Sequence, residues 1–125
     1  MEIVLFDREL EVMEVLWDRG SATVAEVRDA LPDAMARTTV LTVLRRLVDK
    51  GYVTHREEGG RTHRYLPLIE RQQVRESALE RLTHRLFHGS PELLLTHLLR
   101  RQRLSPDELR TLRELVDGEL REEEG

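Results

Sequence analysis

The chain has 125 residues, a formal net charge of −4 and no cysteine. This length suits one domain, or a small domain with an appendage, and the lack of cysteine excludes disulfides, thiolate metal sites and thiol nucleophiles. The sequence has no apolar run of the roughly 18 residues that a membrane helix needs, and "MEIVLFDREL" lacks the features of a secretory signal. We therefore expect a soluble cytoplasmic protein with no membrane segment.

The acidic total hides a basic segment. Residues 36–65 hold seven basic and three acidic residues, a net charge of +4, whereas the rest of the chain carries −8. A local positive field steers a polyanion whatever the total charge of the protein. Charge alone also allows a second interpretation, an ordinary solvated stretch.

The first helices are marked by caps and breakers. Asp7 is the expected N-cap of a helix that ends near Gly20. Thr23 and Glu26 match a capping box, which opens a second helix that Pro32 stops.

A third helix is expected over residues 38–50, closed by Gly51. After it, the helical spacing of the apolar residues ends. "YVTHRE" and "RTHRYL" are short, rich in β-formers and separated by "EGG", which predicts a hairpin over residues 52–66. Three helices followed by a two-stranded ribbon is the order of a winged helix-turn-helix. We place this DNA-binding domain at residues 1–68.

The second half of the chain is predicted to be wholly helical, so the fold class is mainly α. A long helix spans about residues 70–87, and Ser90 followed by proline begins the next. Ser105 and Glu108 form a capping box for a last helix to about Leu120, which leaves "REEEG" as a solvated tail. These three helices make up a predicted dimerisation domain at residues 69–125.

The helix at 38–50 has two chemically different faces. At about 100° per residue, its valines and leucines gather on one arc, and hydroxyl and guanidinium groups lie opposite. The major groove admits such a helix, where Arg bonds guanine and Thr presents a hydroxyl and a methyl group, and a helix N-terminus receives phosphate. The candidate DNA-binding residues here are Arg37, Thr38, Thr39, Thr42, Arg45 and Arg46.

The hairpin adds basic residues around a flexible tip, as a wing lying along the DNA backbone or minor groove would. The candidates are Arg56, Arg61, His63 and Arg64. Strand alternation lets only some of them face DNA, and Glu57 and Glu58 argue against phosphate contact at the tip. Helix and wing together predict a partner of double-stranded DNA. A winged-helix adaptor that binds protein and has no operator is the alternative.

The C-terminal helices carry more apolar surface than they can bury themselves. A second copy would cover it in a two-fold interface, which would also pair two recognition helices on two half-sites. The alternative is that these helices fold back on the winged domain. The candidate dimerisation residues are Leu79, Leu82, Leu86, Leu94, Leu95, Leu98, Leu109, Leu112 and Val116.

The sequence gives little support to catalysis or metal binding. It contains no glycine-rich phosphate loop and no H-E-x-x-H motif, so we expect neither an enzyme nor a cofactor. His84 and His88 have the spacing of a two-histidine metal clip but no evident third ligand. Surface histidines are the expectation, and a metal-gated repressor is a further alternative.

Five stretches resemble the BlaI/MecI penicillinase-repressor family over nearly the whole chain. They are "EVMEVLWDRGSATVAEV", "RTTVLTVLRRLVDKGYV", "GRTHRYLPL", "FHGSPELLLTHLL" and "LSPDELRTLRELV". The resemblance implies a homodimeric winged-helix repressor on inverted-repeat operators, with helix 38–50 in the major groove. It also implies that Thr39, Thr42 and Arg46 occupy the family's groove-facing positions.

Two departures bear on the inducing signal. Family members that answer β-lactams are cleaved at an Asn-Phe bond in the second C-terminal helix, where this chain has His97-Leu98. The copper-responsive branch carries C-terminal cysteines, which this chain lacks. The resemblance therefore leaves the inducer and any upstream sensor protease open.

Overall fold

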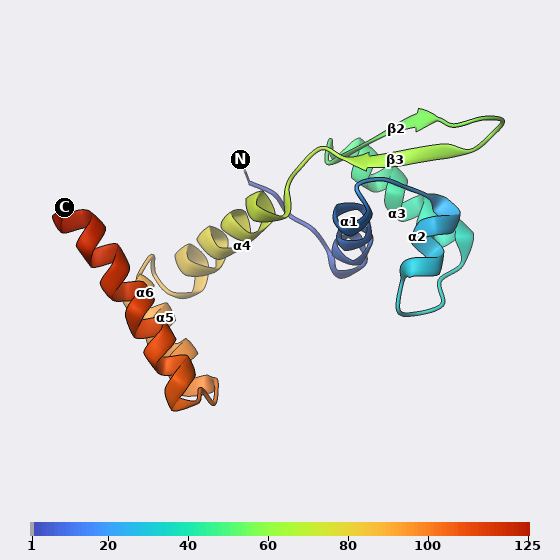
Figure 1. Cartoon of the computed structure of the whole chain (residues 1–125). Helices are drawn as coiled ribbons and strands as arrows, with labels where there is room; N and C mark the ends of the chain where they lie inside the picture. The colour runs from blue at the N-terminus through green and yellow to red at the C-terminus, as the bar shows by residue number, and fades with distance from the viewer. Residues whose placement is uncertain (1) are drawn as a thin grey trace. The chain divides into compact units, whose positions relative to one another are not determined.

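The computed structural model describes residues 2–125, which form helices and a small three-stranded sheet, and the predicted winged helix-turn-helix is confirmed (Figure 1). Over this range every helix is too short or too polar to cross a bilayer. The chain divides into two compact units, Met1–Arg81 and Leu82–Gly125. The elements are α1 (Asp7–Arg19), β1 (Ala22–Thr23), α2 (Val24–Ala30), α3 (Arg37–Asp49), β2 (Val53–Glu57), β3 (His63–Pro67), α4 (Arg71–Leu86), α5 (Pro91–Arg101) and α6 (Pro106–Glu124).

The core of the first unit is formed by one face each of α1, α2 and α3. Val12 and Leu16 of α1, Val27 of α2, and Leu44 and Leu47 of α3 are completely buried. Their spacing of three or four residues puts them on one side of each helix. Burying each such side chain stabilises the fold by about 1.5–3 kcal/mol. Packing therefore fixes the rotation of α3 about its own axis.

The sheet has the order β1-β3-β2 and is antiparallel throughout. Tyr65 of β3 pairs with Ala22 on one side and His55 on the other, and its ring is buried against the core. Gly59 and Gly60 both have positive φ, 80° and 58°, in the turn that joins β2 to β3, a conformation that glycine adopts without a steric penalty. The hairpin is thus anchored at β3 and free at its tip.

Two predicted helix boundaries are wrong. The N-cap of α1 is Phe6 rather than Asp7, and Glu9 caps this end by accepting a 2.8 Å hydrogen bond from the Phe6 amide. The last helix runs to Glu124 rather than Leu120, so the predicted tail is helical. No breaker stands in "REEE", and glutamate and arginine are good helix formers.

The first half of α4 packs with the winged domain. The Ser77 hydroxyl accepts a 2.8 Å hydrogen bond from the Ile3 amide and donates one of 3.2 Å to the Ile3 carbonyl. Arg81 donates to the same carbonyl at 2.8 Å. The packing boundary therefore falls within α4, after Arg81, rather than at the predicted residue 68. A functional division at residue 68 stays a prediction.

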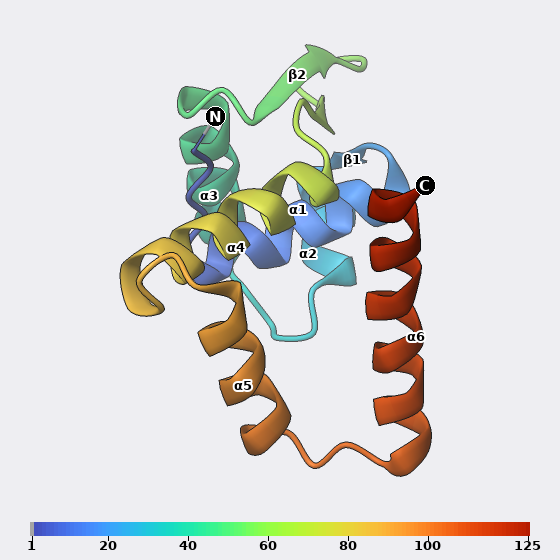
Figure 2. The ribbon, with the colours of Figure 1, turned by 90° about the vertical axis from the view of Figure 1, so that its left-hand side faces the viewer.

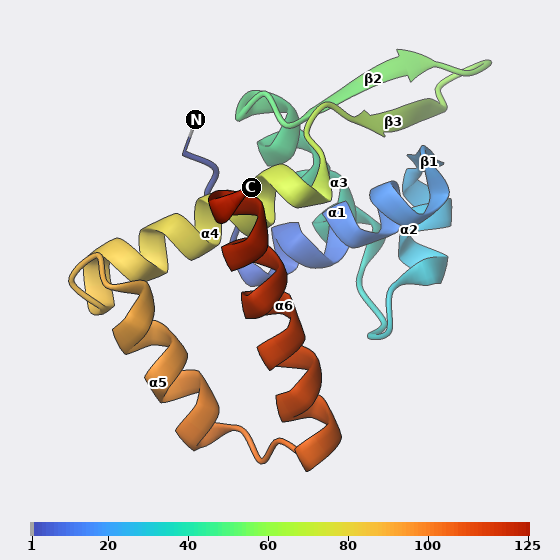
Figure 3. The ribbon, with the colours of Figure 1, turned by 60° about the vertical axis from the view of Figure 1, so that its left-hand side comes forward.

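The second unit is an open arrangement of helices. Ser90 and Ser105 cap α5 and α6 as predicted, each accepting a hydrogen bond of 3.1 Å from an amide in the first turn. The two helices run in opposite directions and diverge from their connecting loop (Figures 2 and 3). Of the residues described in Leu82–Gly125, none is buried. This unit has no core of its own in a single chain.

A buried carboxylate ties α1 to the end of α3. Glu9 has no exposed surface, and one of its oxygens accepts a 2.8 Å hydrogen bond from Lys50, the C-cap of α3. The Lys50 ammonium also lies 4.7 Å from the centre of the Phe6 ring, a cation–π contact. Among the described residues, the second oxygen of Glu9 has no hydrogen-bond partner. Lys50 is therefore the main compensation for this buried charge.

We predict that Lys50→Met destabilises the protein by about 1–3 kcal/mol, because it removes the cation and one of the two hydrogen bonds that compensate the buried Glu9 carboxylate. Urea unfolding followed by the fluorescence of Trp17, the only tryptophan in the sequence, measures this loss. Arg8→Ala is the matched control. It removes an exposed 2.9 Å ion pair with Glu11, and such pairs contribute about 0–1 kcal/mol. Equal destabilisation by the two variants would contradict a special role for Lys50.

Candidate nucleic-acid interface

The core packing of α3 turns its polar residues outward. Val40, Val43, Leu44 and Leu47 are buried, and the six predicted DNA-binding residues from Arg37 to Arg46 are all exposed. The helix carries no acidic residue in its first turn. It therefore presents hydroxyls and cations to solvent without a competing carboxylate near its start.

The exposed surface of α3 divides into two neighbouring arcs. Arg37, Leu41, Arg45 and Val48 line a hollow between α3 and the hairpin. Residues 38, 39, 42 and 46 do not line this hollow and face solvent beside it. We call the second set the outer arc; it carries three threonines and Arg46.

The N-terminus of α3 is open. Its N-cap is Ala36, which has no side chain to accept a hydrogen bond from the first turn. By contrast, α2, α5 and α6 are capped by Thr23, Ser90 and Ser105. Free amides at a helix N-terminus, together with its positive dipole end, favour a phosphate. Arg37, the first residue of α3, adds a cation at the same place.

The outer arc offers varied chemistry for the groove. The Thr42 hydroxyl donates a 2.9 Å hydrogen bond to the Thr38 carbonyl one turn earlier, so its oxygen is left as an acceptor and its methyl group as an apolar contact. The Arg46 side chain has no partner among the described residues and keeps all its donors. This arc can read both hydrogen-bonding and methyl groups on base edges.

The arginines of this unit fall into two groups. Arg8, Arg19, Arg64, Arg71 and Arg81 each make an ion pair or hydrogen bond within the protein. Seven others have no such partner in the described part of the chain. Two of these are Arg28 of α2 and Arg75 of α4, and the other five belong to α3 or the hairpin. They are Arg37, Arg45, Arg46, Arg56 and Arg61. Most of the unpartnered guanidinium groups of this unit therefore belong to α3 and the hairpin.

Arg64 lies differently from the other wing candidates. Its side chain is only 19% exposed, and its Nε atom donates to both oxygens of Glu58 at 2.9 Å. Its Nη1 atom lies 3.1 Å from a Glu26 oxygen and 3.2 Å from the Ser21 hydroxyl. Hydrogen bonding to Glu58 raises the pKa of Arg64 above its ordinary value. Arg64 thus joins the hairpin to α2 and to the segment before β1.

Glu26 completes this anchor. The Thr23 amide donates to it at 2.9 Å, and this bond is the main reason why the pKa of Glu26 lies below its ordinary value, with Arg64 and Arg19 adding to the effect. A lowered folded-state pKa means that the contribution of Glu26 to the free energy of unfolding is fully present above its unfolded pKa. That contribution is lost as the pH falls through the folded value.

His63 lies on the inner side of the hairpin. Its ring stacks on that of His55, with centroids 5.0 Å apart and planes 15° apart, and His55 lies 5.7 Å from the Tyr65 ring. Sequence reasoning assigned His55 only to the hairpin and missed this pairing. Because the two residues are diagonal neighbours across the strands, a hairpin register given in advance would have indicated it.

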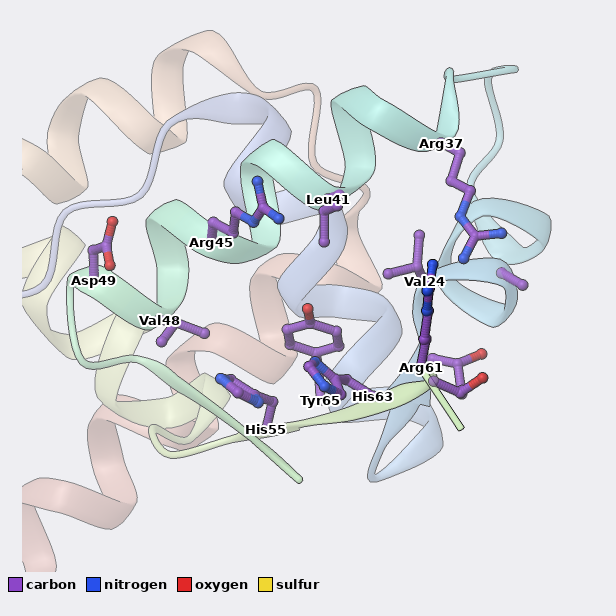
Figure 4. A pocket seen from close by; sticks show the side chains of 13 residues that line it. Val24, Arg37, Leu41, Arg45, Val48, Asp49, His55, Arg61, His63 and Tyr65 are labelled. Carbon is purple, nitrogen blue, oxygen red and sulfur yellow. The ribbon is translucent and has the colours of Figure 1, made fainter. Parts of the chain in front are cut away.

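The hollow between α3 and the hairpin has a volume of about 610 Å³ and is shown in Figure 4. Val24, Leu41 and Val48 give it an apolar floor, and three histidine or tyrosine rings of the hairpin form a second wall. Three of the unpartnered arginines of α3 and the hairpin line it: Arg37, Arg45 and Arg61. We call this hollow the wing pocket. No sequence pattern pointed to it, because its walls meet only through the tertiary fold.

The two histidines considered for metal lie on either side of the end of α4. His84 lies in α4, and His88 lies beyond its end with a left-handed φ of 50°. In residues 2–125, no three histidine, aspartate or glutamate side chains are grouped so as to hold a metal ion. The metal-gated alternative gains no support from this geometry.

Comparison with known proteins gives consistent relatives. The chain is 30% identical over 113 residues to the penicillinase repressor of Bacillus licheniformis, covering 89% of this chain and 88% of that protein. It is 36% identical over 113 residues to the transcriptional regulator BlaI of Mycobacterium tuberculosis, covering 87% and 80% of the two chains.

A solved structure matches more than half of the chain. The solution structure of the DNA-binding domain of the repressor BlaI superposes with a TM-score of 0.50 and 36% identity, covering 57% of this chain and 90% of that one. The family model described as penicillinase repressor matches residues 5–118. With nearly the whole chain matched, this protein belongs to the penicillinase repressor family.

Proposed function

We propose that this protein is a homodimeric transcriptional repressor that binds an inverted-repeat operator through α3 and the β2–β3 hairpin. The observation that carries the proposal is that five of the seven unpartnered arginines of the first unit belong to α3 and the hairpin, beside the three threonines of the outer arc. Unpaired guanidinium groups lose no internal contact when they bind phosphate or guanine. The relatives named as repressors and regulators support the same function. A repressor acts at the chromosome, so the proposal includes a cytoplasmic location.

Within this proposal the residues divide by position. Thr39, Thr42 and Arg46 of the outer arc enter the major groove, and Thr38 lies beside them. Arg37 and the open N-terminus of α3 bind a backbone phosphate. Arg56 and Arg61 are the wing contacts. Arg64, engaged by Glu26 and Glu58, positions the wing instead of touching DNA.

The Glu57-Glu58 tip was the best support for the protein-binding adaptor, and the structure weakens it. Both oxygens of Glu58 accept hydrogen bonds from Arg64 at 2.9 Å. The charge of Glu58 is therefore largely compensated within the hairpin, and Arg56 and Arg61 stay free beside it. A duplex suits this wing better than a basic protein surface does.

The homodimer is proposed because the second unit leaves its leucines uncovered. Leu86 is 69% exposed, Leu98 47% and Val116 57% in the single chain. Exposed apolar surface gathered in this way marks an interaction site, and a two-fold axis would let each copy cover the other. The same axis would place two α3 helices on half-sites about one helical turn, or a multiple of it, apart.

Arg46→Ala should weaken operator binding by about 1–3 kcal/mol, because it removes the only guanidinium group of the outer arc. Fluorescence anisotropy on a duplex that the wild-type protein selects from a random library measures the affinity. Arg8→Ala removes an exposed arginine of α1 that already pairs with Glu11, and this variant should bind the duplex as the wild type does. Unchanged binding by a folded, dimeric Arg46→Ala protein would remove Arg46 from the interface.

Arg61→Ala and Arg64→Ala should have different effects. Loss of a phosphate contact at Arg61 lowers the slope of log affinity against log salt by about 1 and leaves the free protein unchanged. Loss of the Arg64 anchor instead speeds hydrogen exchange of the hairpin amides in the absence of DNA. Anisotropy at several salt concentrations and exchange mass spectrometry separate the two. Hairpin exchange that is the same in Arg64→Ala as in the wild type would refute the anchor.

Leu98→Glu and Val116→Glu should each shift the protein from dimer to monomer at about 10 μM, since a charge would be buried in an apolar interface. Sedimentation velocity measures the change. Leu68→Glu is the control: it is an exposed leucine (59%) of the first unit and should leave the dimer intact. A wild-type protein that is monomeric at this concentration would contradict the proposed dimer.

A further inference from the structure

We infer that the wing pocket binds a small aromatic carboxylate, and that this ligand competes with operator DNA. The second half of the inference rests on the proposed function, and the first half does not. The site lies wholly within the first unit, between α3 and the hairpin (Figure 4).

The size and lining of the pocket suit a small molecule. Its volume of about 610 Å³ falls within the range of about 300–1,000 Å³ that is usual for ligand sites. Val24, Leu41 and Val48 offer an apolar floor. Such sites combine an apolar surface with a few convergent polar groups, and both are present here.

The aromatic wall favours a flat ligand. His55 and His63 stack at 5.0 Å, and the Tyr65 ring lies 5.7 Å from His55, at an interplanar angle of 47°. All three rings line the pocket. A bound aromatic ring would find offset or edge contacts against this wall and the aliphatic floor opposite it.

Two arginines at one end of the pocket favour a carboxylate. Arg37 extends from the start of α3 and Arg61 from the tip of the hairpin, and both reach the pocket beside Val24 (Figure 4). Neither guanidinium has a partner among the residues described. A guanidinium group binds a carboxylate through two parallel N–H donors. Asp49, the acidic residue of the lining, lies at the far end in Figure 4.

The apolar floor distinguishes this ligand from a simple phosphate. A backbone phosphate of DNA would engage the arginine end and leave the floor and the three rings unused. An aromatic carboxylate uses both ends of the pocket at once. Inorganic phosphate therefore tests whether the pocket is only a binding site for a backbone phosphate of DNA.

Occupation of the pocket would oppose DNA binding directly. Arg37, Arg45 and Arg61 line the pocket and are also proposed DNA contacts. A carboxylate bound there neutralises the positive charge that the operator needs. By linkage, the operator must weaken the binding of the ligand by the same factor.

The test titrates 2-naphthoate into the full-length protein without DNA, by calorimetry and by NMR of the hairpin amides. We expect saturable binding, with shifts in residues 55–65 and weaker binding of both 2-naphthalenemethanol, its neutral counterpart, and inorganic phosphate. Arg61→Gln should weaken naphthoate binding at least about tenfold by removing a charged hydrogen-bond donor. Arg56 belongs to the same hairpin but lies outside the pocket lining, so Arg56→Gln should bind naphthoate with the affinity of the wild type.

Three results would overturn the pocket: no saturable binding of naphthoate up to about 10 mM, a range that covers weak sites; equal affinity for the alcohol; or equal affinity for phosphate. In a second experiment, naphthoate is added to the operator complex, and we expect it to release the DNA. Naphthoate that binds the free protein and leaves the operator affinity unchanged would overturn the competition. A protein that binds naphthoate and no duplex would refute the proposed function and leave the pocket standing.

Discussion

The burial of one apolar stripe of α3 determines which of its residues face the hairpin and which face solvent. Val40, Val43, Leu44 and Leu47 enter the core, and their spacing leaves one rotation of the helix available. That rotation directs one polar arc toward the hairpin and the other toward solvent. A change in helix rotation would exchange the two arcs, so the same apolar contacts that stabilise the unit also define its binding surface.

Charge placement reconciles the acidic total of the chain with a cationic binding surface. The first unit uses several of its carboxylates internally: Glu9 holds Lys50, and Glu26 and Glu58 hold Arg64. Carboxylates that are already paired add little negative potential at the surface. The unpaired arginines of α3 and the hairpin contribute their full positive potential. A protein with a net charge of −4 can thus present a cationic face to DNA, because the field depends on which charges are compensated.

The sequence predicted most of what depends on local periodicity. The core stripe of α3 and the capping boxes at Thr23 and Ser105 follow from residues three or four positions apart, and each is present in the structure. Features that depend on distant partners were not predictable in this way. They include the two-residue strand β1, the partners of Arg64 from three segments, and the wing pocket. Arg64 shows the limit of prediction from sequence most clearly. Its residue type and its position in the hairpin suggested a DNA contact, and only its spatial neighbours show that it joins the hairpin to α2.

In the proposed dimer, the second unit would make the response of the repressor depend on two copies. No residue described there is buried. In the proposed dimer its helices would gain their apolar contacts from the partner, so operator affinity and dimer formation would be thermodynamically linked. Each copy of a dimer would then bring its own wing pocket to its own half-site. If a ligand must leave both pockets before both half-sites are filled, operator affinity falls with the square of the free-pocket fraction. Release would then be steeper in ligand concentration than binding to a single site, without any contact between the two pockets.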